Sequence, residues 1–189
     1  MKTILIMGGN DVSLNIGRKL KKSEPLDRTY QTHRMKLLFT NGPLFYVEYS
    51  FRLFWFLLFQ KSTLLLSNDL DTLLPNYMVS KLKRSELIYD SHELFPEAPE
   101  LQNRPFVKSI WMGLERFLLP KLKHAYTVCQ SISDYYQKRY GVQMKVVRNV
   151  PFRKTYISAE KRTKTLIYQG SINPGRGLEL AIDSLQYLS

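Results

Sequence analysis

Leu87–Glu97 (LIYDSHELFPE) changes abruptly from an apolar run to polar residues, a pattern typical of a strand end in an α/β fold. The run Leu87–Tyr89 is typical of a short buried strand, and the polar residues Asp90–Glu93 follow at its end. In a wound α/β sheet, ligands gather where parallel strands end and the chain turns outward. A carboxylate, a hydroxyl and an imidazole at such an end form a candidate site. The alternative is that Asp90 and Ser91 satisfy backbone donors in a turn, with His92 partly exposed.

The composition is that of a globular protein with a buried core. Of the 189 residues, 44% are hydrophobic and 23% are charged. The length is enough for one large domain, or for one domain and part of another. The single cysteine, Cys129, excludes an internal disulfide framework and fits a reducing compartment. The apolar run Lys2–Met7 is too short for a signal peptide, so we expect a cytoplasmic location.

The net charge of +12, from 28 Lys and Arg against 16 Asp and Glu, favours an anionic partner. Nucleic acid, an anionic membrane face and a phosphorylated substrate are the three candidates. The basic residues are dispersed along the chain, and no compact nucleic-acid-binding motif accompanies them. Charge alone therefore does not decide between the three.

The amino-terminal segment predicts a strand, a turn and an ambiguous third element. Lys2–Met7 (KTILIM) is a predicted buried strand, and Gly8 and Gly9 predict a tight turn after it. Such a turn could let backbone N–H groups approach a ligand phosphate, although two glycines alone are a weak signal. Asp11–Ile16 could open a helix or form a second strand. If it is a strand, the few residues before it cannot make a parallel crossover, which needs about a dozen residues.

A long apolar segment, Leu44–Gln60, follows a short predicted strand at Arg34–Phe39. Its internal charges, Glu48 and Arg52, are four apart and would share one face of a helix, where they can pair. The segment is too short and too charged for a membrane span, which requires about 20 apolar residues. We expect a packed core helix, whose aromatic residues could also lie at a membrane surface.

The clearest sign of a parallel sheet is a strand–helix–strand unit before the opening stretch. Ser62–Ser67 and Glu86–Tyr89 are predicted strands, and the helix Leu73–Lys81 between them would be capped by Asp69 or Asp71. The pattern then repeats through helices at Pro105–Leu119 and Ile132–Tyr140 and strands at Ala125–Cys129 and Lys145–Val147, with Gly141 as a left-handed helix cap.

The organisation predicted from these patterns is a first domain over residues 1–150, a basic linker over 151–164 and a new α/β pattern over 165–189. The new pattern consists of a strand at Thr165–Gln169, a glycine- and proline-rich turn and a helix at Leu178–Leu188. One strand and one helix cannot bury both faces of a sheet. We therefore expect this end of the chain to be the start of an incomplete second domain.

Several blocks in this order carry a family resemblance: Leu66–Pro75 (LSNDLDTLLP), Leu87–Glu97, Leu114–Ser133 (LERFLLPKLKHAYTVCQSIS), Val146–Pro151 (VVRNVP) and Tyr168–Glu179 (YQGSINPGRGLE). Together they resemble bacterial family 4 glycosyltransferases of the GT-B fold. The resemblance implies two Rossmann-like domains across a cleft, the first on the acceptor side and the second binding a nucleotide sugar. The glycosyl group would pass with retention of its anomeric configuration.

The resemblance also implies roles for individual residues. His92 matches the histidine near the transferred sugar, Gly8 and Gly9 match the loop facing the donor phosphates, and Arg176 matches the cation that binds the leaving diphosphate. Gly170 and Gly177 would let the backbone come close to that diphosphate. The expected substrate-side positions, which follow the predicted strands, are Asn68, Asp69, Asp90, Glu93, Arg148 and Asn149. No metal and no cofactor besides the donor substrate is expected.

Two features depart from the family pattern. The paired glutamates that hold the nucleotide ribose and the donor sugar would lie beyond Ser189. The crossover helix that normally joins the first two strands is missing, since the sequence passes almost directly from Gly8-Gly9 to Asp11–Ile16.

The expected function is transfer of a hexose from a nucleoside diphosphate sugar to a glycan or lipid-linked acceptor, in the cytoplasm or on the inner face of the cell membrane. This length alone is expected to lack activity, because most of the donor pocket is absent. The alternative is a non-catalytic remnant or basic module that binds an anionic membrane or glycan surface. Nucleic acid is not an expected partner, since the aromatic residues lie in core-like apolar runs.

Overall fold

A computed structural model describes residues 2–7, 12–19, 31–151, 153, 166–170, 172 and 177–187. The chain divides into two compact units, Met1–Asn149 and Val150–Ser189. Gly8, Gly9 and Arg176, and most of the predicted linker over 151–164, lie outside the described residues.

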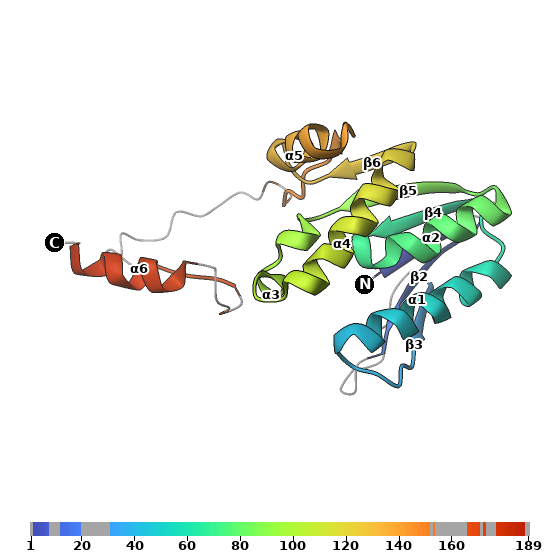
Figure 1. Ribbon diagram of the computed structural model, residues 1–189, viewed down its shortest axis with the longest axis horizontal. Helices are drawn as coiled ribbons and strands as arrows, with labels where there is room; N and C mark the ends of the chain where they lie inside the picture. The colour runs from blue at the N-terminus through green and yellow to red at the C-terminus, as the bar shows by residue number, and fades with distance from the viewer. Residues whose placement is uncertain are drawn as a thin grey trace. The chain divides into compact units, whose positions relative to one another are not determined.

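The first unit is built on one seven-stranded sheet of order β3-β2-β1-β4-β5-β6-β7 (Figure 1). Its strands are β1 (Lys2–Met7), β2 (Val12–Arg18), β3 (Gln31–Met35), β4 (Leu64–Asn68), β5 (Glu86–Ser91), β6 (His124–Thr127) and β7 (Lys145–Val146). The strands from β4 to β7 pair in parallel, as β2 and β3 do. The predicted α/β class with parallel strands and flanking helices is confirmed.

Strand β1 departs from the predicted all-parallel sheet, because it pairs antiparallel with both β2 and β4. The ambiguous segment Asp11–Ile16 is therefore a strand over its described residues. Only four residues separate Met7 from Val12, which is too few for a parallel crossover. The sequence predicted this constraint, and the antiparallel pairing of Met7 with Val12 satisfies it.

Four main helices flank the sheet: α1 (Gly42–Phe59), α2 (Leu70–Lys83), α4 (Pro105–Leu118) and α5 (Gln130–Tyr140). The shorter helical turns η1 (Phe95–Glu97), α3 (Pro99–Gln102) and η2 (Leu119–Lys121) connect β5 to β6 on either side of α4. Helices α1, α2 and α4 lie along the same face of the sheet (Figure 1). Gly141, with φ of 69°, caps α5 in the left-handed conformation as predicted.

The core forms where α1 and α2 pack on the strands. One face of α1, carrying Tyr49, Leu53 and Leu57, is fully buried together with Leu65 of β4. Residues spaced by four occupy one side of a helix, which explains why this stripe faces the sheet. The predicted pair on α1 forms, with Arg52 Nε 2.8 Å from Glu48 Oε1. No helix in the described ranges combines the length and apolarity that crossing a bilayer requires.

The second unit contains α6 (Leu178–Ser184) followed by the turn η3 (Leu185–Tyr187). The helix predicted at Leu178–Leu188 is thus present over its described residues. The strand predicted at Thr165–Gln169 is wrong for residues 166–169, which have no regular secondary structure. A strand is stable only when a neighbouring strand completes its backbone hydrogen bonds. No strand of this unit lies beside residues 166–169 in the described ranges.

Candidate active site at the carboxyl edge of the sheet

Three polar residues lie in register where adjacent parallel strands end. Asn68 of β4 pairs with Asp90 of β5, and Asp90 pairs with Tyr126 of β6. Register partners in a sheet share a face, so these side chains form a row across the carboxyl edge. The loops that continue from β4 and β5 add Asp69 and His92 to the same edge.

Asp90 is the centre of this row. His92 Nε2 lies 2.9 Å from Asp90 Oδ2, and the Tyr126 hydroxyl donates to the same oxygen at 2.9 Å. Burial, together with the hydrogen bond to Asp90, raises the pKa of Tyr126, so the phenol keeps its proton and remains a donor. The second oxygen of Asp90 is buried and has no hydrogen-bond partner among the described residues.

This geometry orients the imidazole. When Nε2 carries the proton and donates to Asp90, Nδ1 is left as an acceptor. The His92 side chain is 39% exposed, whereas that of Asp90 is only 9% exposed. A buried carboxylate therefore holds a ring that a ligand can reach, an arrangement suited to accepting a hydroxyl proton.

Asp69 fixes the backbone around His92. Its N–H donates to the Asp90 carbonyl at 2.8 Å, and its Oδ1 accepts from the His92 N–H at 3.1 Å. The Asp69 backbone has φ of 63° and ψ of 166°, a region that favours glycine. The residue is held in this conformation while its side chain supports the turn after β5.

The prediction that Asp69 or Asp71 caps α2 through its side chain is wrong. Asp69 occupies the position before the helix but makes no side-chain cap there, because its carboxylate is directed to His92. The Thr72 hydroxyl instead donates back to the Asn68 carbonyl at 2.9 Å. Asp71 is buried in the first turn, and this burial raises the pKa of its carboxyl to about 7.

Ser91 secures the other side of β5. Adjacent strand residues point to opposite faces, and the Ser91 hydroxyl lies 3.1 Å from the Tyr136 hydroxyl of α5. Glu115 of α4 accepts hydrogen bonds from Tyr136 at 3.2 Å and from Tyr140 at 2.8 Å. Burial raises the pKa of Glu115 although both phenols oppose the shift. This network ties the end of β5 to two helices and so keeps the strand end in place.

The remaining predicted positions are spread more widely. Glu93 is exposed, and its backbone carbonyl accepts from the Ser91 hydroxyl at 3.1 Å. Arg148 and Asn149 are exposed beyond β7, which lies two strands from β5. Gly170 and Gly177 belong to the second unit, where Gly177 precedes α6 with φ of 69°. Thus Asp69, Asp90 and His92 come into direct contact, with Asn68 alongside in register.

Sequence reasoning missed Tyr126, Tyr136 and Glu115. Tyr126 lies near the start of the predicted strand Ala125–Cys129, so its position did not mark it as a strand-end residue. It shares a face with Asp90 only once the register of β5 and β6 is known. Glu115 and Tyr136 carry no signal either, since helical spacing does not reveal which charged residue turns inward.

The described ranges contain no group of three His, Cys, Asp or Glu side chains that could hold a metal ion. The absence of a metal requirement stays a prediction. A scan against models of known protein families gave no match, and a search of curated proteins gave no significant match. The chain's functional assignment therefore depends on its own residues and their arrangement.

Proposed function

We propose that this chain is the acceptor-side domain of a retaining GT-B glycosyltransferase, followed by the first elements of its donor domain. The reaction would transfer a hexose from a nucleoside diphosphate sugar to a glycan or lipid-linked acceptor. The observation that supports the proposal is His92, held by Asp69 and Asp90 at the carboxyl edge of parallel strands. Ligands of wound α/β folds bind at this edge.

In this proposal His92 lies beside the transferred sugar. Its Nδ1 accepts a hydrogen bond from a sugar hydroxyl, while Asp90 holds the opposite ring nitrogen and itself accepts a hydrogen bond from the Tyr126 hydroxyl. The departing nucleoside diphosphate gains negative charge, which Arg176 and the backbone N–H groups near Gly170 and Gly177 would stabilise. The donor is a substrate, so the proposal includes neither a cofactor nor a metal.

A peripheral membrane contact is part of the proposal, because a lipid-linked acceptor would be presented at the cytoplasmic face. Helix α1 supports it with an outward stripe of exposed apolar side chains at spacing four: Val47, Phe51, Trp55 and Phe59. A hollow beside this stripe is lined by Arg34, Lys36 and Arg52. Aromatic residues with adjacent cations are the composition of an interfacial helix.

The test uses a reading frame extended beyond Ser189, titrated calorimetrically with UDP- and GDP-hexoses and assayed for sugar transfer. We expect the extended chain to bind one of these donors, and the 189-residue chain to show no transfer. His92→Ala in the extended chain should lower the transfer rate about tenfold or more, because the loss of a hydrogen bond to a buried polar group costs about 1–3 kcal/mol.

Gln137→Ala is the control, because Gln137 is exposed on α5 and lies outside the row at the carboxyl edge of the sheet. It should leave transfer unchanged. Retention of full transfer by His92→Ala would contradict the assigned role of His92. Failure of the extended chain to bind any nucleotide sugar would favour the alternative of a non-catalytic basic binding module.

A further inference from the structure

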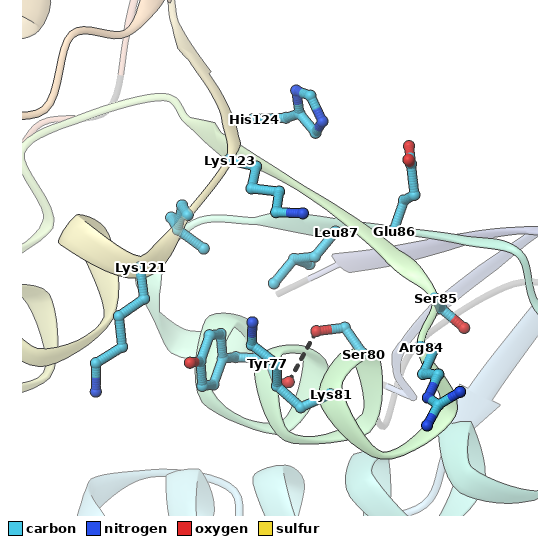
Figure 2. Close-up of a pocket in the computed structure, with 11 residues that line it drawn as sticks. Tyr77, Ser80, Lys81, Arg84, Ser85, Glu86, Leu87, Lys121, Lys123 and His124 are labelled. Carbon is cyan, nitrogen blue, oxygen red and sulfur yellow. Dashed lines mark hydrogen bonds between the residues drawn. The ribbon is translucent and has the colours of Figure 1, made fainter.

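A second hollow, of about 350 Å³, lies at the amino ends of β5 and β6, away from the edge that carries His92. The last turn of α2, the start of β5 and the segment from η2 into β6 line it (Figure 2). Its cations are Lys81, Arg84, Lys121 and Lys123, and we call it the basic hollow.

Two of these cations converge on the same space. Figure 2 shows the Lys81 and Lys123 side chains reaching into the hollow from α2 and from the approach to β6. Lys121 and Arg84 lie at its rim, with the Lys121 amine 3.0 Å from the centre of the Phe117 ring. Gathering like charges around a concavity is unfavourable unless an anion is bound there, because each charge raises the potential at the others.

Within the fold the Lys81 amine lies 5.3 Å from the centre of the Tyr77 ring, a weaker contact than those made by the neighbouring Lys83. The Lys83 amine donates to the carbonyls of Leu57 and Gln60 and so joins the ends of α2 and α1. Lys81 and Lys123 make no ion pair within the described ranges. A basic last turn also complements the dipole of a helix, but Lys123 lies outside any helix.

Glu86 is the one carboxylate among the residues that line the hollow. It is exposed, and in Figure 2 it extends away from the space between the two lysine amines. The hollow therefore keeps an uncompensated positive charge. Its walls include the Tyr77 ring and the buried Leu87, which give an apolar surface beside the charge.

We propose that the basic hollow binds a phosphate-bearing ligand between Lys81 and Lys123. Lysine amines bind phosphate as compact point charges with three donors each. The apolar wall at Tyr77 and Leu87 suits the organic part of a phosphate ester or a lipid headgroup. The site is distinct from the proposed transferase site, so either assignment can fail without the other.

The test measures binding of two probes to the full 189-residue chain. Inorganic pyrophosphate is titrated calorimetrically, and phosphatidylglycerol vesicles are compared with phosphatidylcholine vesicles by co-sedimentation. Pyrophosphate binding would indicate a soluble phosphate ligand, and selective retention on phosphatidylglycerol would indicate a lipid headgroup. The Lys81→Gln/Lys123→Gln double variant should weaken whichever binding is seen by about tenfold or more, since two charge-assisted contacts are lost.

The matched control is Lys19→Gln/Arg104→Gln, which removes the same charge at exposed positions after β2 and before α4 that do not line the hollow. It should change the affinity less than about twofold, because exposed charges outside the hollow are largely screened by salt. Lys81→Arg/Lys123→Arg should retain binding, and circular dichroism checks that each variant is folded. Absence of binding to both probes would overturn the proposal. Equal loss in the glutamine variant and the control would also overturn it, because the effect would then be one of net charge.

Discussion

Replacing Asp69 by glycine and, separately, by alanine tests whether the turn after β4 is strained in order to hold His92. Both substitutions remove the carboxylate that accepts from the His92 N–H at 3.1 Å. Only glycine relieves the backbone, whose φ of 63° and ψ of 166° lie in a region that L side chains rarely adopt. The difference between the two variants therefore isolates the strain from the lost hydrogen bond.

The expected size of this difference follows from two opposing effects. A residue other than glycine in such a region costs about 1–3 kcal/mol. Glycine has more conformations to lose on folding than alanine, which costs the glycine variant about 0.4–1 kcal/mol. We expect Asp69→Gly to have a free energy of unfolding roughly 0.5–2 kcal/mol higher than that of Asp69→Ala.

Urea denaturation followed by tryptophan fluorescence measures both free energies. The control pair is Asp134→Gly and Asp134→Ala, because Asp134 is exposed on α5 and accepts a comparable hydrogen bond from Gln130 at 2.8 Å. In a helix the order reverses, and the glycine variant should be about 1 kcal/mol less stable. Equal stability of the two Asp69 variants, or a more stable alanine variant, would refute strain at this position.

Three further predictions concern stability. Burial raises the folded-state pKa of Asp71 from 3.8 to about 7, so the folded state holds this proton more tightly than the unfolded state does. The free energy of unfolding should therefore fall as pH rises between these two values and level off above them. Asp71→Asn should remove that part of the pH dependence in urea titrations, and an unchanged slope would show that another group titrates. Leu57→Ala should cost about 2–5 kcal/mol in urea denaturation because Leu57 is fully buried, whereas Phe51→Ala on the exposed face of the same helix should stay within about 0.5 kcal/mol. Tyr126→Phe removes a donor from the buried carboxylate of Asp90 and should lower the free energy of unfolding by about 1–3 kcal/mol; an unchanged urea midpoint would place that carboxylate in water.

Most helices and strands of the first unit follow from local patterns and were predictable from the sequence. The strand predicted at Arg34–Phe39 is wrong over residues 36–39, because β3 spans Gln31–Met35. The stripe of Tyr49, Leu53 and Leu57 and the adjacent pair Glu48–Arg52 give α1 its helical spacing, and the structure confirms both. The direction of β1 was not predictable in the same way. A buried strand reads as a continuous apolar run whichever way it points, so only the short connection to Val12 restricts its pairing.

The candidate site was only partly predictable, for a related reason. Asp90 and His92 are two residues apart, and their position after an apolar run marks them as a strand end. Tyr126 is 36 residues from Asp90, and their contact depends on the register of two strands, which no local pattern encodes. The side chain of Asp69 was predicted to cap a helix because aspartate commonly does so. It bonds to His92 instead, since the folded sheet brings that N–H within its reach.

The conformations at the two ends of α2 connect the candidate site with the basic hollow. Asp69 before the helix and Arg84 after it are the two non-glycine residues with positive φ in the part of the chain that the structure describes. Glycine would be the less costly residue at both positions. Asp69 contributes a carboxylate that holds His92, and Arg84 contributes a cation to the rim of the hollow. If both edges of the sheet bind ligands, as proposed, we expect α2 to keep Asp69 and Arg84 at its ends although each of them strains the backbone. If Arg84→Gly leaves phosphate binding unchanged while raising the free energy of unfolding, the strain at Arg84 serves no ligand. Only the strain at Asp69, beside His92, would then be tied to a binding site.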